Sequence, residues 1–234
     1  MSTFVSAIKE SLLQLFYPHV CAGCGSDALT PESQLCIKCI HGLPLTGFEK
    51  HASNIIDKSL TGRIRFINAT SQLYFNKESP VQRLMHEFKY RGNKSLGRQL
   101  GVMMGVQLQE SGRFGNVEAL IPLPLYETKQ KQRGYNQSTV LCEGIQEVLK
   151  LPVIENAIER PLFTETQTKK NRVDRWKNME GKFKVTNPAL IQNRHVLLVD
   201  DVITTGATIE SCATELVNAG ALVSIATLCY ASKF

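Results

Sequence analysis

The chain has 234 residues, of which 43% are hydrophobic and 21% are charged, enough for one medium domain or a smaller domain with an appendage. This composition excludes intrinsically disordered, collagen-like and coiled-coil proteins. No apolar run reaches the roughly 18 residues of a transmembrane helix, so no membrane insertion is expected. The net charge is +6, and the basic excess is concentrated in Lys77–Arg98 and Arg160–Lys184. A solvated helix face explains such clusters, and binding of phosphate, diphosphate or nucleic acid is the sharper interpretation.

The first residues predict an amphipathic helix, because apolar side chains recur every four residues from Phe4 to Phe16. Lys9 and Glu10 interrupt what would have to be the apolar segment of a signal peptide. We therefore expect a protein that is not exported and that resides in the cytoplasm.

Four of the seven cysteines form a C-x2-C-x11-C-x2-C pattern: Cys21, Cys24, Cys36 and Cys39. Each C-x-x-C pair presents two thiolates to one ion, and two pairs complete the tetrahedron that Zn²⁺ prefers. Two disulfides or four incidental thiols are the alternatives, and disulfides would require an oxidising compartment. Four thiolate ligands leave no open coordination position, so the pattern predicts structural zinc. With the N-terminal helix, this zinc-binding module is expected to occupy residues 1–45.

The rest of the chain alternates between strand and helix patterns after a polar joint at 46–61. The expected elements are a strand at Thr70–Phe75, a helix from Pro80 through Phe88, a helix at Ser95–Glu110, a strand at Val117–Leu123 with a polar loop after it, a helix at Asn136–Leu149, a short strand at Pro152–Asn156, a strand at Val196–Val199, a helix at Ala207–Ala219 and a strand at Leu222–Tyr230. This order predicts an α/β fold at 60–234, with a parallel sheet and helices on both faces. The strand at Val196–Val199 is apolar throughout, as a strand buried on both faces would be.

The segment most specific for one kind of ligand follows that apolar strand. Asp200 and Asp201 come directly after it, and a Thr-rich turn containing Gly206 then leads into a helix. Ligands bind at the carboxyl ends of parallel strands, and the N–H groups that begin a helix bind anions. Two carboxylates cannot bind a phosphate, but they suit the hydroxyls of a sugar attached to it. The alternative is helix capping, which needs only one polar residue at the start of the helix. The segment has several, and it therefore predicts a pocket for a ribose 5-phosphate.

This segment resembles the PRPP (phosphoribosyl pyrophosphate) motif of type I phosphoribosyltransferases over the whole of Val196–Thr208. The resemblance implies that Asp200 and Asp201 bind the ribose hydroxyls. It also implies that five residues hold the 5-phosphate: Thr204, Thr205, Gly206, Ala207 and Thr208. The Walker A and G-x-G-x-x-G patterns are absent, so nucleoside triphosphate hydrolysis and dinucleotide binding have no support.

Other stretches look like the ComF/GntX family: Phe88–Asn93, Ile121–Pro124, Arg133–Ser138 and the spaced set Arg160, Thr164, Gln167, Arg172 and Asn178. The resemblance implies a type I phosphoribosyltransferase-like parallel sheet flanked by helices and preceded by a small four-cysteine zinc module. The family is associated with natural transformation, the uptake of single-stranded DNA, beside a helicase-like partner in some bacteria.

Two basic segments are candidates for binding diphosphate. Arg133, with Lys129 and Lys131, lies on the polar loop after the Val117–Leu123 strand, where type I enzymes have their diphosphate loop. The segment 160–181 would be the mobile flap of these enzymes, with Lys170 and Arg172, beside Lys169 and Arg175, as its diphosphate contacts. A solvated basic loop and an ordinary surface loop are the respective alternatives.

Three functions stay open at this point. The first is a phosphoribosyltransferase in which a nitrogen nucleophile displaces Mg²⁺-diphosphate from PRPP, while Asp200 and Asp201 hold the sugar for in-line attack. Its acceptor is unidentified and would bind under a hood formed by about 60–115. The second is a DNA-uptake adaptor that keeps the nucleotide pocket as a ligand site and contacts single-stranded DNA through its basic clusters. The third is a zinc-dependent scaffold with a vestigial pocket.

Overall fold

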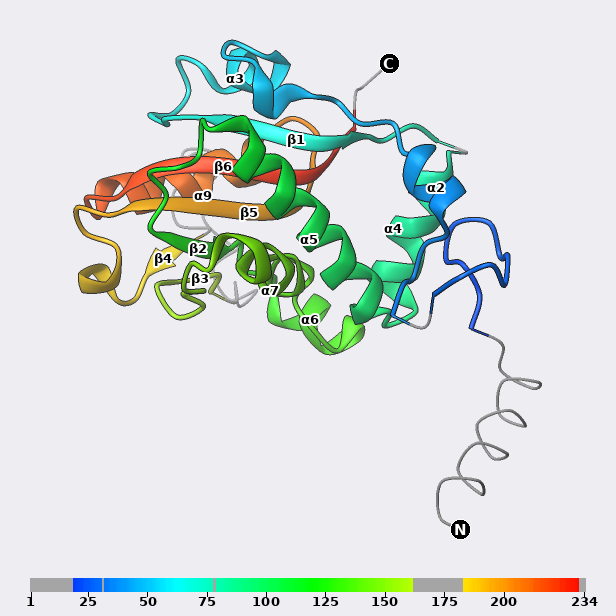
Figure 1. Cartoon of the computed structure of the whole chain (residues 1–234). Helices are drawn as coiled ribbons and strands as arrows, with labels where there is room; N and C mark the ends of the chain where they lie inside the picture. Colours follow the sequence, from blue (N-terminus) through cyan, green and yellow to red (C-terminus); the bar gives the residue numbers. More distant parts are fainter. Residues whose placement is uncertain (1–18, 31, 78, 162–182, 232–234) are drawn as a thin grey trace.

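The computed structural model describes residues 19–30, 32–77, 79–161 and 183–231 (Figure 1). Within them, the main sheet has four strands: β1 (Ala69–Tyr74), β2 (Ala119–Pro122), β5 (His195–Ile203) and β6 (Leu222–Tyr230). Their order across the sheet is β1-β6-β5-β2, and every neighbouring pair is parallel. The predicted parallel α/β architecture is confirmed.

Helices cover both faces of this sheet. The helices α5 (Lys94–Ser111) and α7 (Gln137–Leu149) lie on one face, and α9 (Ala207–Asn218) lies on the other (Figure 1). Side chains of β5 enter an apolar cluster on each face of the sheet. Leu197 and Val199 belong to the cluster that contains α5 and α7. Val196 and Leu198 belong to the cluster that contains α9. The apolar run in the sequence therefore is a central strand buried on both sides, as expected.

Glycines bring α5 and α7 into direct backbone contact. A Cβ atom on Gly101 would lie 2.4 Å from the carbonyl oxygen of Leu141, and one on Gly144 would lie 2.2 Å from the carbonyl oxygen of Arg98. Only glycine permits such an approach. This contact fixes α7 on the sheet, and the first turn of α7 meets the carboxyl end of β5.

The stretch 46–61 is folded, so the prediction of a polar joint is wrong. It contains the 3₁₀ helix η1 (Phe48–Lys50) and the helix α3 (Ile55–Leu60). Asn54 and Asp57 form a capping box at the start of α3, and Asp57 Oδ1 also accepts from the N–H of Ala69 at 2.9 Å. These polar side chains serve internal hydrogen bonds and not solvent, which composition alone does not reveal.

Two details around β2 also differ from expectation. The residues predicted as a polar loop after β2 form the helix α6 (Glu127–Arg133). This helix buries no side chain, so it lacks the apolar periodicity by which helices are found in a sequence. The strand expected at Pro152–Asn156 is reduced to a single bridge between Val153 and Leu120, and β3 (Ile158–Glu159) instead pairs antiparallel with β4 (Lys184–Val185).

The four-cysteine segment packs against the helix α4 (Pro80–Tyr90) and α5 (Figure 1). Cys21, Leu35 and Cys36 belong to the same apolar cluster as the buried face of α4. The short helix α2 (Ile37–His41) lies in the four-cysteine segment. The predicted N-terminal amphipathic helix lies outside the described residues. Among the helices that the structure describes, none has the length and apolar character needed to cross a membrane.

Candidate functional site

The carboxyl end of β5 presents Asp200 and Asp201 side by side. The backbone N–H of Asp201 donates to Asp200 Oδ1 at 2.8 Å, and the hydroxyl of Ser138 donates to the same oxygen at 3.3 Å. Ser138 comes from the first turn of α7, where Asn136 caps the helix by accepting from the Ser138 N–H. The tight packing of α5 against α7 thus sets the position of a hydroxyl that orients Asp200.

Sequence reasoning missed Lys89 as a site residue. Its Nζ lies 2.9 Å from Asp201 Oδ2, and the two side chains are 18% and 13% exposed. Lys89 is the penultimate residue of α4, and it follows Phe88, the last buried residue of that helix. The signal in the sequence is a lysine at the inner end of an amphipathic helix, which does not by itself show what the lysine contacts.

The acidic pair has unusual electrostatics. Burial and the negative charge of Asp201 raise the pKa of Asp200 to about 7, against the opposing effects of the Asp201 N–H, the Lys89 ammonium and the Ser138 hydroxyl. Near neutral pH the Asp200 carboxyl therefore exchanges its proton readily.

The turn between β5 and α9 has the form of an anion-binding loop. Gly206 has φ of 76° and precedes the first residue of α9. The first helical hydrogen bond runs from the N–H of Glu210 to the carbonyl of Gly206, so the N–H groups of Thr208 and Ile209 precede it. Such N–H groups and the positive end of the helix dipole attract a phosphate.

Arg63, which follows α3, holds this loop in place. Its guanidinium donates to the carbonyl oxygen of Thr205 at 2.8 Å and forms an ion pair with Glu210 on α9. A Cβ atom on Gly206 would lie 3.0 Å from Leu60 of α3, so α3 packs closely beneath the loop. Thr204, Thr205 and Ala207 remain exposed to a ligand. Arg63 is a second residue that sequence reasoning missed, because its partner lies far along the chain.

Arg133 is the last residue of α6. Its guanidinium donates to Gln137 Oε1 at 2.8 Å and lies over the ring of Tyr90, 5.5 Å from its centroid. Gln137 directly precedes Ser138 in the sequence, and Tyr90 directly follows Lys89. Both partners of Arg133 are therefore sequence neighbours of site residues. By contrast, Lys131 pairs with Glu127 along α6 and is exposed. The other predicted diphosphate contacts, Lys170 and Arg172 with Lys169 and Arg175, lie outside the described residues.

A groove of about 280 Å³ lies at the carboxyl end of β2. Its lining includes Pro122 and Pro124 from the expected Ile121–Pro124 stretch, and Asn136 from the start of α7. Arg160 closes one side, with its guanidinium 3.6 Å from the ring centroid of Tyr126 and 5.0 Å from that of Phe183. This groove adjoins the residues that lead into 162–182.

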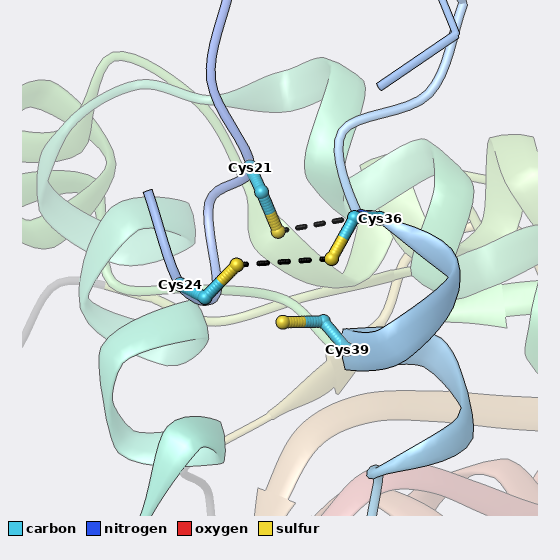
Figure 2. A group of neighbouring side chains, drawn as sticks. All are labelled: Cys21, Cys24, Cys36 and Cys39. Carbon is cyan, nitrogen blue, oxygen red and sulfur yellow. Dashed lines mark hydrogen bonds between the residues drawn. The ribbon is translucent and has the colours of Figure 1, made fainter. Parts of the chain in front are cut away.

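The four predicted cysteines converge on one point (Figure 2). Their ligand atoms lie within 4.8 Å of one another, and the Sγ atoms of Cys24 and Cys36 are 3.7 Å apart. A zinc ion held at 2.3 Å by four thiolates requires an edge of about 3.8 Å between sulfurs. All four cysteines are free thiols and not disulfides. The donor set and its spacing therefore fit a metal such as zinc.

The backbone around the cysteines supports this arrangement. A Cβ atom on Gly23 would lie 2.8 Å from Cys39 Sγ, so the turn between Cys21 and Cys24 requires glycine. The N–H of Cys36 donates to Cys21 Sγ at 3.3 Å. Burial alone would raise the pKa of Cys21, but backbone N–H groups, that of Cys36 foremost, lower it to about 6. These bonds favour the thiolate, which is the form that ligates a metal.

Comparison with known proteins shows what the second part of the main domain is similar to. The family model for the phosphoribosyl transferase domain matches residues 149–233, which include β5, the Thr-Gly loop, α9 and β6. The site described above lies within and beside this match. Residues 149–233 of the chain are therefore similar to the phosphoribosyl transferase domain.

Curated relatives extend the likeness to nearly the whole chain. Competence protein F of Haemophilus influenzae is 34% identical over 137 residues, which are 56% of this chain and 58% of that protein. DNA utilization protein YhgH of Escherichia coli K12 is 26% identical over 93% of this chain and 92% of the relative, and competence protein ComFC of Bacillus subtilis is 23% identical over 85% and 84%. These homologues confirm the resemblance to the ComF/GntX family.

Solved structures show a more distant likeness. Glutamine phosphoribosylpyrophosphate amidotransferase from Bacillus subtilis, complexed with ADP and GMP, has 19% sequence identity and a TM-score of 0.44. The match covers 61% of this chain and 30% of that chain.

Proposed function

We propose that the protein binds PRPP or a related ribose phosphate at the carboxyl end of β5 and transfers the ribosyl phosphate group to a nitrogen acceptor. The observation that carries this proposal is the direct succession of the Asp200–Asp201 pair and the Thr-Gly loop at the start of α9. Carboxylates suited to sugar hydroxyls and N–H groups suited to a phosphate adjoin each other, as a ribose 5-phosphate requires.

Each part of the ligand has a proposed partner. Asp200 and Asp201 accept hydrogen bonds from the ribose hydroxyls, and the loop from Thr204 to Thr208 holds the 5-phosphate. Arg133 contacts the diphosphate, together with Lys170 and Arg172 of the proposed flap. Mg²⁺ bound to the diphosphate supplies further positive charge for the leaving group.

In the proposed reaction, the bond between the anomeric carbon of the ribose and the diphosphate oxygen breaks. The acceptor nitrogen forms the new bond to that carbon and loses its proton to water, and the electron pair of the broken bond leaves with the diphosphate. The acidic pair contributes by fixing the ribose hydroxyls, so that the nitrogen and the leaving oxygen lie in line. The basic residues contribute by stabilising charge on the diphosphate.

The proposal includes a role in DNA uptake. Relatives named competence protein and DNA utilization protein support this role. The second candidate function is a non-catalytic adaptor that binds single-stranded DNA beside a helicase-like protein. It is favoured by the exposed ring of Tyr90, which is 59% exposed under the Arg133 guanidinium, since aromatic rings beside cations bind unpaired bases. Free thiolates require a reducing compartment, so the cytoplasm is the proposed location.

Calorimetric titration of Mg²⁺-PRPP into the purified protein tests the proposal. We expect saturable binding by the parent, its loss in an Asp200→Asn/Asp201→Asn variant, and no change in a Glu110→Gln control, whose carboxyl is exposed at the far end of α5. Absence of binding by the parent at millimolar PRPP would refute the enzyme proposal.

A second assay separates the two candidates. Release of diphosphate in the presence of nitrogenous bases indicates transfer. Binding of single-stranded DNA that falls steeply with salt, without diphosphate release, indicates the adaptor.

A further inference from the structure

The helix α4 connects the four-cysteine module to the acidic pair. Along one face it buries four side chains, Val81, Leu84, Met85 and Phe88, in the same apolar cluster as Cys21, Leu35 and Cys36. The residue after Phe88 is Lys89, which pairs with Asp201. In Figure 1, α4 accordingly lies between the cysteine segment and the ends of the strands. One short helix therefore touches both sites.

The position of Lys89 depends on how Phe88 is held. The Phe88 side chain is fully buried, and its carbonyl oxygen accepts a hydrogen bond from the hydroxyl of Tyr135. A Cβ atom on Gly97 would lie 2.1 Å from the Phe88 ring, so α5 contacts that ring directly. Because its neighbour is fixed in this way, the backbone of Lys89 cannot shift toward or away from Asp201 without a change in core packing.

A second connection runs through Gln34, two residues before Cys36. Its backbone N–H donates to Gln99 Oε1 at 2.7 Å, and its side-chain Oε1 accepts from Asn93 Nδ2 at 3.2 Å. Asn93 caps α5 and lies in the turn that follows α4. The loop between the cysteine pairs is thus attached to the turn that follows α4, through Asn93, and to α5, through Gln99.

Within the described residues, Lys89 makes the only ion pair to either carboxylate. Both members of this pair are mostly buried, so loss of the ammonium would leave two adjacent carboxylates without a countercharge. The lysine therefore holds the Asp201 side chain in place for a ligand.

We propose that the four-cysteine module positions Lys89 against Asp201 through α4, so that metal loading of the module sets how tightly the acidic pair holds a ribose phosphate. A bound metal crosslinks Cys21 and Cys36, which flank the loop that packs on α4 and contacts Asn93. Lys89 is a positioning residue, because it acts through Asp201. The second half of this inference rests on the proposed ribose-phosphate function.

The first test uses the full-length protein, loaded with zinc or stripped by a chelator that is then dialysed away. We expect stripping to weaken Mg²⁺-PRPP binding on the order of tenfold. Gln34→Ala, which keeps all four cysteines, and Lys89→Met should weaken it to a similar degree, whereas Lys50→Met, an exposed lysine without an ion pair among the described contacts, should not. Stripping should have no further effect on Lys89→Met, since the lysine carries the coupling.

Hydrogen exchange followed by mass spectrometry provides a readout that needs no ligand. Stripping should speed exchange in the second half of α4 and the turn after it, at 84–93. It should leave exchange in α9 unchanged, which also shows that the stripped protein is folded. Equal affinity of loaded and stripped protein, or losses from stripping and Lys89→Met that simply add, would overturn the coupling. If the loaded parent binds no PRPP, the proposed function fails, and unchanged exchange in α4 then overturns the inference separately.

Discussion

The Asp200 carboxyl gives the site a measurable pH signature. Its pKa is raised to about 7 by burial and by Asp201, from 3.8 for the free side chain. The stabilisation of the folded state by its proton is therefore complete below about pH 4 and is lost as the pH rises through 7. Asparagine stays neutral, so the unfolding free energy of Asp200→Asn relative to the parent should increase between pH 4 and pH 8. Urea unfolding at these pH values measures this difference, and a difference independent of pH would contradict it.

Lys89 should control the same titration. Its ammonium lowers the pKa of Asp200, so Lys89→Met removes that effect and should shift the midpoint of the Asp200 titration upward. Carbon-13 NMR of the aspartate carboxyls follows this midpoint directly. The exposed Lys50→Met variant is the matched control and should leave it in place. An unshifted midpoint in Lys89→Met would show that the ion pair does not form in solution.

Buried polar atoms elsewhere predict an internal water. Glu49 Oε2, Thr70 Oγ1 and both side-chain polar atoms of Gln72 are buried without a partner among the described residues. They line a small cavity of about 10 Å³ between β1 and α5, the volume that one water molecule occupies. Two groups that can donate and two that can accept match the four hydrogen bonds of water. A crystal structure should show one ordered water there, and the absence of electron density in the cavity would contradict this.

At the scale of single residues, the sequence predicted what depends on local spacing. The four cysteines meet as expected, because each C-x-x-C pair closes on itself and the pattern needs only two pairs to converge. The order of Asp200, Asp201 and Gly206 along one strand and turn likewise defines their grouping. Lys89 and Arg63 could not be found in this way, because their partners are reached only after the chain has folded.

Among the elements, the contact between α5 and α7 is the one most sensitive to substitution. A methyl group at Gly144 would lie 2.2 Å from the Arg98 carbonyl oxygen and 2.7 Å from the Val102 nitrogen, and backbone atoms cannot turn aside. Gly144→Ala should lower the free energy of unfolding by about 3 kcal/mol or more. Gly115→Ala is the control, because its Cβ would meet only the Gly112 carbonyl at 3.7 Å. Chemical denaturation measures the free energy of unfolding of both variants, and equal values would contradict the helix contact.

Elements with an apolar period were predictable, and those without one were not. The strands β1, β5 and β6 and the helices α5, α7 and α9 lie where their hydrophobic patterns place them. The exceptions are α6, whose side chains all face solvent at least in part, and α3, whose polar residues are occupied by a capping box. In both cases the sequence looks like a loop, because polarity reflects burial more directly than it reflects backbone conformation.

For the molecule as a whole, we expect one cooperative unfolding transition. The sequence predicts two units, at 1–45 and 60–234, but Cys21, Leu35 and Cys36 share an apolar cluster with α4 and α5. Removal of the metal should therefore lower the melting temperature of the entire chain. Differential scanning calorimetry of loaded and stripped protein measures this effect. Two separate transitions, with only the lower one sensitive to chelator, would show that the module is an independent unit.

The strand order has a consequence for how the protein emerges from the ribosome. β1 lies at the edge of the four-stranded sheet, and its neighbour in that sheet is β6, so that Ala69 meets Ile225. During translation, the early strand must wait for nearly the whole remaining domain before its neighbour exists, and β2 must likewise wait for β5. The cysteine segment, whose ligands are close together in the chain, can close around its metal long before then. A nascent chain halted before β6 should thus carry a finished metal module on an unfinished sheet.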